Sequence, residues 1–168
     1  MSSTLRKLGL TIACIALLGA GTTLAVAAKK GTTSGGTTAG GNAAQTQYGT
    51  GGQGCTPGYW KNHTGSWQGY SPSDNFDKIF GIKYFGSLTL QQAAGLGGGG
   101  FNALARHAAA ALLNSSNPNI SYGLSTAKII ELVQQAVKTN EPELIKDDLS
   151  GLNESGCSID AHGKPISH

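Results

Sequence analysis

The densest group of chemically capable side chains lies in residues 55–67. It comprises two neighbouring rings, three polar side chains and a second tryptophan: Tyr59, Trp60, Lys61, Asn62, His63 and Trp67. Exposed rings could stack on a sugar or a peptide while the polar groups donate hydrogen bonds. Buried rings would instead enlarge a core that is otherwise built from Ala, Leu and Ile, and their polar tips would need partners. The composition favours burial of Trp60 and Trp67 and leaves a recognition surface as the alternative.

A second polar pair, Arg106 and His107, lies on the polar face, or at its border with the apolar face, of a predicted helix over residues 101–113. In a compact domain these two side chains could approach His63 and contribute to the same binding site. A solvated or capping role for each of them is the plainer alternative, and we favour it.

An enzyme needs a nucleophile, a base or a metal in a defined arrangement. The chain has no Gly-x-Ser-x-Gly turn of the kind that carries a hydrolase nucleophile. His63 and His107 could bind a metal with Asp74 or Asp77, but 44 residues separate the histidines and no ligand spacing connects them. We therefore expect no catalytic residue, no metal and no cofactor. The alternative is a small secreted hydrolase or metal-dependent protein that uses His63 and His107.

Helical patterns dominate residues 55–157, and no alternating strand pattern is present. Apolar residues form one stripe over residues 101–113, where the many alanines also favour a helix. A second helix is expected to start at Ser125 or Thr126. A third should open at Asn140-Glu141-Pro142-Glu143 with Asn140 as its N-cap. Its expected buried side comprises Leu144, Ile145, Leu149 and Leu152.

Two shorter helices are expected before these three. Ser73 can cap the first, and Gly81 suits its end. Thr89 and Gln92 fit a capping box for the second, which can run only to Ala94. The prediction is an all-α fold, a small irregular helical bundle preceded by an irregular aromatic segment.

The N-terminal residues have the features of a secretory signal peptide. Arg6 and Lys7 precede an apolar run over residues 8–18, and Ala25-Val26-Ala27 supplies the small residues typical of a cleavage site. The run is shorter than the roughly 20 apolar residues that a membrane-spanning helix needs. We predict a signal peptide over residues 1–27, cleaved after Ala27 or one residue later after Ala28, with an uncleaved anchor as the alternative.

Cleavage would remove Cys14 and leave Cys55 and Cys157 in an oxidising compartment. Two cysteines there normally pair. Two free thiols or one metal site are the alternatives, but the chain lacks the paired CxxC motifs of a zinc ribbon. We predict a Cys55–Cys157 disulfide that closes a domain over residues 55–157.

The charge of the exported chain would be close to neutral, because cleavage takes away 2 of the 12 Lys and Arg residues and none of the 9 Asp and Glu residues. No basic stripe is left to bind a nucleic acid, and no stable membrane insertion is expected after cleavage. Residues 28–54 are rich in Gly and Thr and predict a disordered, flexible linker. This linker could act as a spacer or be a simple tail. Residues 158–168 read as a polar tail in which His162 and His168 are expected to be disordered.

The run Cys-Thr-Pro-Gly-Tyr-Trp-Lys-Asn-His over residues 55–63 resembles the CTPGYWKNH motif of a family of secreted bacterial and archaeal proteins, often modules of surface proteins. Residues 104–114 and the Asn-x-x-Gly-Cys over residues 153–157 are similar to two later parts of the family pattern, in the same order. The chain departs from the pattern at Ser158-Ile159, where Pro-Leu is frequent. The family has no assigned activity, so the resemblance implies a compartment and a fold.

Taken together, these features predict a secreted, non-catalytic extracellular module with a structural, adhesive or ligand-binding role. Its partner would be an extracellular ligand or surface partner, either a glycan or a protein.

Overall fold

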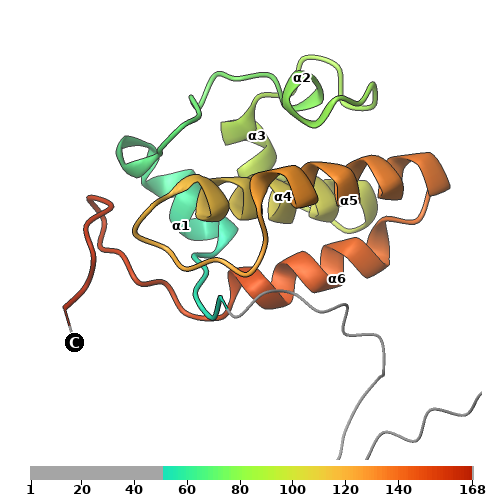
Figure 1. Cartoon of the computed structure of the whole chain (residues 1–168). Coiled ribbons are helices and arrows are strands. Elements are labelled where there is room, and N and C mark those ends of the chain that lie inside the picture. Colours follow the sequence, from blue (N-terminus) through green and yellow to red (C-terminus); the bar gives the residue numbers. More distant parts are fainter. Residues whose placement is uncertain (1–50, 168) are drawn as a thin grey trace, which may run out of the picture. The chain divides into compact units, whose positions relative to one another are not determined.

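The computed structural model describes residues 51–167 (Figure 1). The predicted signal peptide and most of the predicted linker lie outside these residues. The described chain forms six α-helices, one short 3-10 helix and no β-strand, in agreement with the predicted all-α class. The elements are α1 (Pro57–Asn62), η1 (Thr64–Ser66), α2 (Phe76–Phe80), α3 (Leu90–Ala94), α4 (Gly100–Ser116), α5 (Thr126–Thr139) and α6 (Pro142–Asn153). No helix within residues 51–167 is long and apolar enough to cross a membrane.

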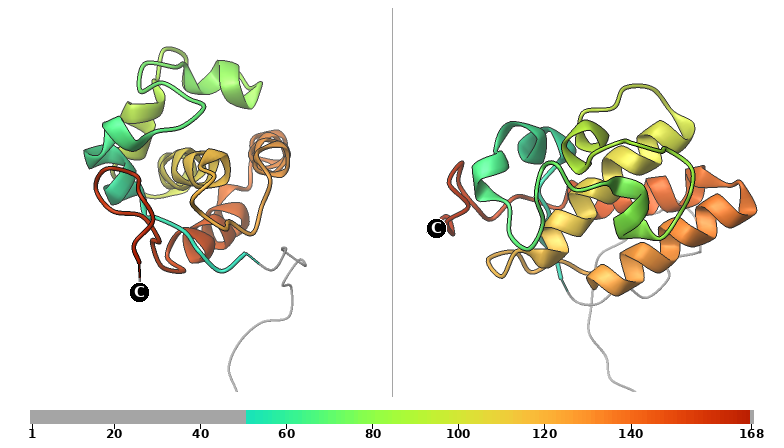
Figure 2. Two further views of the ribbon diagram at one scale, coloured as in Figure 1. Left: turned by 60° about the vertical axis from the view of Figure 1, so that its left-hand side comes forward. Right: turned by 90° about the horizontal axis from the view of Figure 1, so that it is seen from above.

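The fold is organised around α4, against which α1, α3, α5 and α6 all pack. The left view of Figure 2 shows α4 nearly end-on, with α5 and α6 on one side and α1 and α3 on the other. Of the 17 residues of α4, 11 are buried, including the unbroken run over residues 107–114. Alanine dominates this run, because a helix contacted from several sides needs small side chains as well as a high helix propensity. The helix predicted over residues 101–113 is thus confirmed and continues to Ser116.

Helix α5 begins as the sequence predicts, because the Ser125 side chain accepts a hydrogen bond from the Lys128 amide. The prediction that Asn140 caps α6 is wrong. Asn140 instead ends α5 in the left-handed conformation with φ of 59°, which asparagine tolerates better than most residues. Helix α6 starts at Pro142, where the missing proline N–H costs no hydrogen bond.

The buried side of α6 is narrower than predicted. Ile145 and Leu149 are buried and Leu152 is partly buried, but Leu144 is 64% exposed. A helix turns by about 100° per residue, so the residue next to Ile145 lies well round the helix from the Ile145–Leu149 stripe. Only that stripe faces the core, and the prediction for Leu144 is wrong.

The short helices α2 and α3 are joined at their N-termini, where the backbones of their N-cap residues form a β-bridge. Asn75, and not Ser73 as predicted, caps α2, and its backbone forms an isolated antiparallel bridge with Thr89. Gly81 ends α2 in the left-handed conformation, φ 64°, as expected. The capping box of Thr89 and Gln92 opens α3, which ends at Ala94. The loop over residues 81–88 is therefore fixed at both ends.

The disulfide between Cys55 and Cys157 joins the two ends of the domain and confirms the predicted pairing, with the two Cα atoms 4.3 Å apart. Beside it, the Gly54 amide donates to the Gly156 carbonyl over 2.9 Å. A side chain at position 54 would overlap with the Leu152 carbonyl oxygen, so only glycine fits this close approach. Since residues 51–54 already pack on the domain, the last part of the predicted linker belongs to the fold.

Residues 158–167 fold back on the domain, so the expected disorder at His162 is not found. Ile159 is buried, and the Asp160 carboxylate accepts hydrogen bonds from the His162 and Lys164 amides. The Asn119 side chain also donates to the Gly163 carbonyl. One buried isoleucine and one aspartate turn order a segment whose overall composition is polar.

Candidate functional site

The motif segment forms α1 and places Trp60 in the core. Thr56 caps the helix by accepting a hydrogen bond from the Tyr59 amide, and Pro57 occupies the first turn. Pro57 and Trp60 are the buried residues of this helix. Trp60 is completely buried, and Trp67 is 8% exposed. Neither tryptophan presents a ring to solvent.

The indole N–H of Trp60 is hydrogen-bonded to a buried network of asparagine side chains. The Asn114 side-chain oxygen accepts hydrogen bonds from the indole Nε1 of Trp60 over 3.1 Å and from the Cys55 amide over 2.8 Å. The Asn114 Nδ2 donates to the Cys55 carbonyl and to the side-chain oxygen of Asn153, each over 2.9 Å. Asn114 and Asn153 are both completely buried. One side chain from α4 therefore holds Cys55 by both of its backbone groups.

Asn153 continues the network across α6. Its side-chain oxygen also accepts from the Tyr122 hydroxyl, and its Nδ2 donates to the backbone carbonyl of His107, each over 2.9 Å. Every polar atom of the two asparagine side chains is bonded, which is what a buried amide requires. The three segments that resemble the family pattern thus meet at one place in the core.

Tyr59 and Trp67 extend this packing toward the surface. The Trp67 indole donates to the Trp60 carbonyl over 3.0 Å. The Tyr59 ring packs edge-on against Trp60 and stacks on His63 with centroids 4.5 Å apart. Its hydroxyl donates to the Asp160 carbonyl in the C-terminal segment. Tyr59 therefore joins α1 to the folded-back tail.

Lys61, Asn62 and His63 have local roles at the end of α1. The Lys61 stem lies against Gly95, the Asn62 side chain donates to the Gly58 carbonyl over 3.0 Å, and the His63 Nδ1 lies 2.8 Å from the Tyr59 carbonyl oxygen. Lys61 and Asn62 are exposed, and His63 is partly buried.

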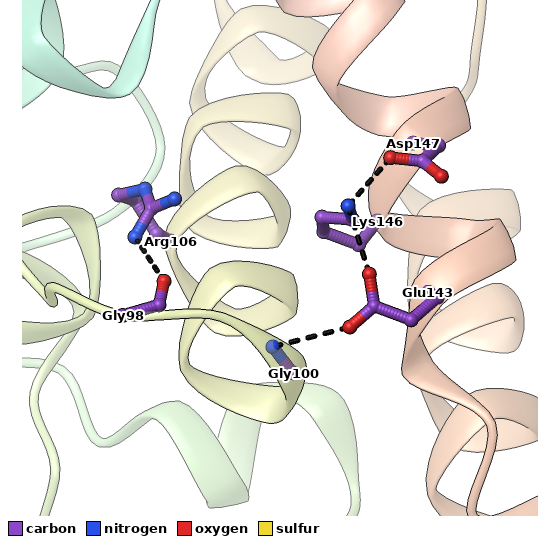
Figure 3. Close-up of polar contacts among 6 residues, drawn as sticks. All are labelled: Gly98, Gly100, Arg106, Glu143, Lys146 and Asp147. Atoms are coloured by element: carbon purple, nitrogen blue, oxygen red, sulfur yellow. Dashed lines mark hydrogen bonds and ion pairs between the residues drawn. The ribbon is translucent and has the colours of Figure 1, made fainter.

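Arg106 secures the glycine-rich turn before α4. Its Nη1 donates to the Leu96 carbonyl over 2.7 Å and to the Gly98 carbonyl over 3.3 Å. From the other side, the Glu143 carboxylate accepts the Gly100 amide over 3.2 Å and pairs with Lys146 (Figure 3). The carboxylate lies at the start of α4, where a negative charge complements the helix dipole. The run over residues 97–100 is thus held on both sides.

His107 lies against α6 and is 8% exposed. Its Nδ1 is buried without a hydrogen-bond partner in the described chain. Burial lowers the pKa of His107, and the positive charges of Arg106 and Lys146 lower it further against the opposing effect of Glu154 and Asp147. These effects favour the neutral form of the imidazole.

The candidate residues do not form one reactive centre. Tyr59, Trp60, His63 and Trp67 belong to one cluster around α1, Arg106 binds the glycine-rich turn, and His107 faces α6. No hydrogen bond or ring contact in the described residues joins His63 to His107, and these residues contain no group of three His, Cys, Asp or Glu side chains that could hold a metal ion.

Sequence reasoning missed the residues that organise the polar interior. Asn114 ends the segment 104–114 and precedes a serine, and Asn153 begins the segment 153–157 and precedes a glutamate. In these positions both asparagines look like ordinary residues at the end of a helix. The one sequence feature that could have pointed to these two asparagines is the resemblance to the family pattern, since both lie inside the segments that resemble it. Asp77 is a second case, because its carboxylate accepts the amides of Tyr84, Phe85 and Gly86. A single aspartate in a short helix gives no such hint.

The chain matches no family model, no curated protein and no solved structure.

Proposed function

We propose that the protein is an exported, non-catalytic extracellular module with a structural, adhesive or ligand-binding role. The observation that carries the proposal is the closure of the domain at Cys55–Cys157. Disulfides of this kind persist in oxidising compartments, and closing a loop of about 100 residues can stabilise a small domain by up to about 4.7 kcal/mol. The signal peptide expected over residues 1–27 and the resemblance of residues 55–157 to a secreted family support the same compartment.

The roles of the motif side chains support a structural interpretation of the motif. Trp60 is buried and its indole is bonded, and the amide of Asn114 is saturated by its neighbours. An active-site group needs access to substrate. His107 has little access, and His63 is engaged with Tyr59. A small hydrolase or metal-dependent protein using these histidines has correspondingly less support.

Export is tested on protein recovered after expression of the full chain in a secreting bacterial host. Sequencing of the recovered N-terminus should give a start at Ala28 or Lys29. Alkylation before reduction should leave Cys55 and Cys157 unmodified, and alkylation after reduction should modify both. A start at Met1, or two thiols that react without reduction, would contradict the proposal.

The metal-dependent alternative is tested by elemental analysis of the same protein. We expect no transition metal at a stoichiometric level, both in the unaltered protein and in His63→Ala. Zinc bound one to one and lost in His63→Ala, with the fold retained, would replace the proposal by the alternative.

A further inference from the structure

We propose that this chain is exported along a route on which the unfolded chain receives no N-linked glycan, because glycosylation of two of its own asparagines would block folding. The inference rests on the proposed function and deepens it, since it specifies the kind of export that the domain tolerates. Its starting point is the acceptor motif for N-linked glycans, Asn-x-Ser or Asn-x-Thr with x other than proline. The sequence contains four such motifs, at Asn62, Asn114, Asn119 and Asn153.

N-glycosylation changes the same side-chain nitrogen through which an asparagine donates hydrogen bonds. The transferase joins C1 of a sugar to the asparagine Nδ2, while the bond from C1 to the pyrophosphate of a lipid-linked oligosaccharide breaks and the Nδ2 loses one proton. One of the two side-chain N–H groups is thereby replaced by a bulky, strongly hydrated group. A glycosylated asparagine therefore fits a fold only where one N–H is spare and the side chain reaches solvent.

Asn114 and Asn153, which we call the inner pair, do not meet these conditions. Both are completely buried, and Asn114 lies on α4, against which the other helices pack (Figure 2). The two N–H groups of Asn114 donate to the Cys55 carbonyl and to the Asn153 side-chain oxygen. The Asn153 Nδ2 donates to the His107 carbonyl in the same interior. Because protein interiors are close-packed, a sugar ring on either nitrogen would keep the three segments of the network apart.

Asn62 and Asn119, which we call the outer pair, meet both conditions. Both residues are exposed. The Nδ2 of each donates to one carbonyl over 3.0 Å, that of Gly58 for Asn62 and that of Gly163 for Asn119. An amide nitrogen has two N–H groups, so one of them is spare in each of these side chains. The folded domain can therefore carry a glycan on the outer pair and not on the inner pair.

The inner pair stays accessible until late in export, because its partners are distant in the chain. Asn114 bonds to Cys55, 59 residues earlier, and to Asn153, 39 residues later. The domain cannot close before Cys157 has emerged, 43 residues after Asn114. When export accompanies synthesis, those residues take about 2–9 s at roughly 5–20 residues per second. A transferase at the exit of the export channel would therefore meet Asn114 before its burial.

The experiment compares two hosts that differ in N-glycosylation, a secreting bacterium without it and a yeast with it. In the yeast, a yeast signal peptide replaces residues 1–27 and the rest of the chain is unchanged. Protein from the bacterium should be folded and have an unmodified mass. Protein from the yeast should be retained in the cell and should carry glycans on the inner pair. The sites are mapped by N-glycosidase treatment, which converts each glycosylated asparagine to aspartate.

Matched variants separate the two pairs without changing any asparagine. Ser116→Ala/Ser155→Ala removes the motifs of the inner pair. It should raise the yield of secreted, folded protein from the yeast by about tenfold or more, because misfolded chains are removed before secretion. Thr64→Ala/Ser121→Ala removes the motifs of the outer pair and should leave the yield within about twofold. Thermal unfolding of both variants from the bacterium should show that they fold like the unaltered protein.

Equal yields of the unaltered protein and the inner-pair variant from the yeast would overturn the proposal. Unaltered protein that is secreted and folded, with the inner pair either glycosylated or unmodified, would overturn it as well, and this result does not depend on the variants. Either outcome leaves the proposed function to its own test, because N-terminal processing and thiol state are measured in the bacterial host, where no N-glycan is added.

Discussion

Replacement of Asn114 by alanine should destabilise the domain by about 4 kcal/mol. The change removes the acceptor for the Cys55 amide and the Trp60 indole, and the donor for the Cys55 carbonyl. Asn153 loses one donor but keeps the Tyr122 hydroxyl. Three buried groups thus lose this partner, each at about 1–3 kcal/mol. We expect a value near the lower end of the sum, because water can enter a polar cavity and bond to some of these groups.

A loss of this size is a large part of the 5–15 kcal/mol that stabilises a typical domain. It is measured by urea unfolding with the disulfide intact, followed by tryptophan fluorescence, in which Trp60 itself reports on the network. The matched control is Asn102→Ala, the same substitution at an exposed position of the same helix. The control should change the free energy of unfolding by less than about 0.5 kcal/mol.

A loss of less than about 1 kcal/mol in Asn114→Ala would contradict the role given to this side chain. That result would mean that water satisfies all three groups, or that the surrounding structure relaxes to pair them. A change in the slope of the unfolding transition would also matter, because it would show a less compact native or denatured state in place of a simple loss of stability.

Three further predictions concern the rest of the core. The double variant Cys55→Ser/Cys157→Ser should lower the free energy of urea unfolding by about 3–5 kcal/mol, and an unchanged midpoint would contradict the role given to the disulfide. Since the pKa of His107 is lowered in the fold, the unfolded chain binds more protons, and stability should fall as the pH drops from 7 to 5. His107→Gln should reduce this pH dependence, and an identical slope in both proteins would exclude His107 as its source. Leu149→Ala should cost about 2–5 kcal/mol in thermal or urea unfolding, whereas Leu144→Ala should cost less than about 0.5 kcal/mol; equal losses would show that the two leucines are not divided between core and solvent.

Local patterns predicted five of the six described helices, because the causes of those helices lie within a few residues of each other. The prediction of an irregular segment before them is wrong, because Pro57–Asn62 form α1. The capping box of Thr89 and Gln92 and the Ser125 cap are formed by groups three residues apart, which a sequence displays directly. Asn140 shows the limit of this reasoning. An asparagine between two helices can cap the second or end the first, and the choice depends on how α5 and α6 pack together.

The C-terminal segment and the first residues of the domain could not be predicted from composition. Ile159 reads as an isolated apolar residue in a polar tail, yet it is buried. Gly54 reads as linker, yet its backbone pairs with Gly156 and passes close to Leu152. The partners of Gly54 lie about 100 residues away in the chain, and only the closed fold brings them together.

The polar interior also clarifies what the motif is for. The segments around Cys55, Asn114 and Asn153 are far apart in the sequence, but the two asparagine side chains link all three by hydrogen bonds. An apolar residue in place of either asparagine could not form these hydrogen bonds. Such a network constrains residue identity as strongly as an active site does, because each change strands a buried donor or acceptor. A pattern of Trp, Asn and Cys residues is therefore explained by closure of the fold. A binding surface on this domain would therefore use side chains outside the network.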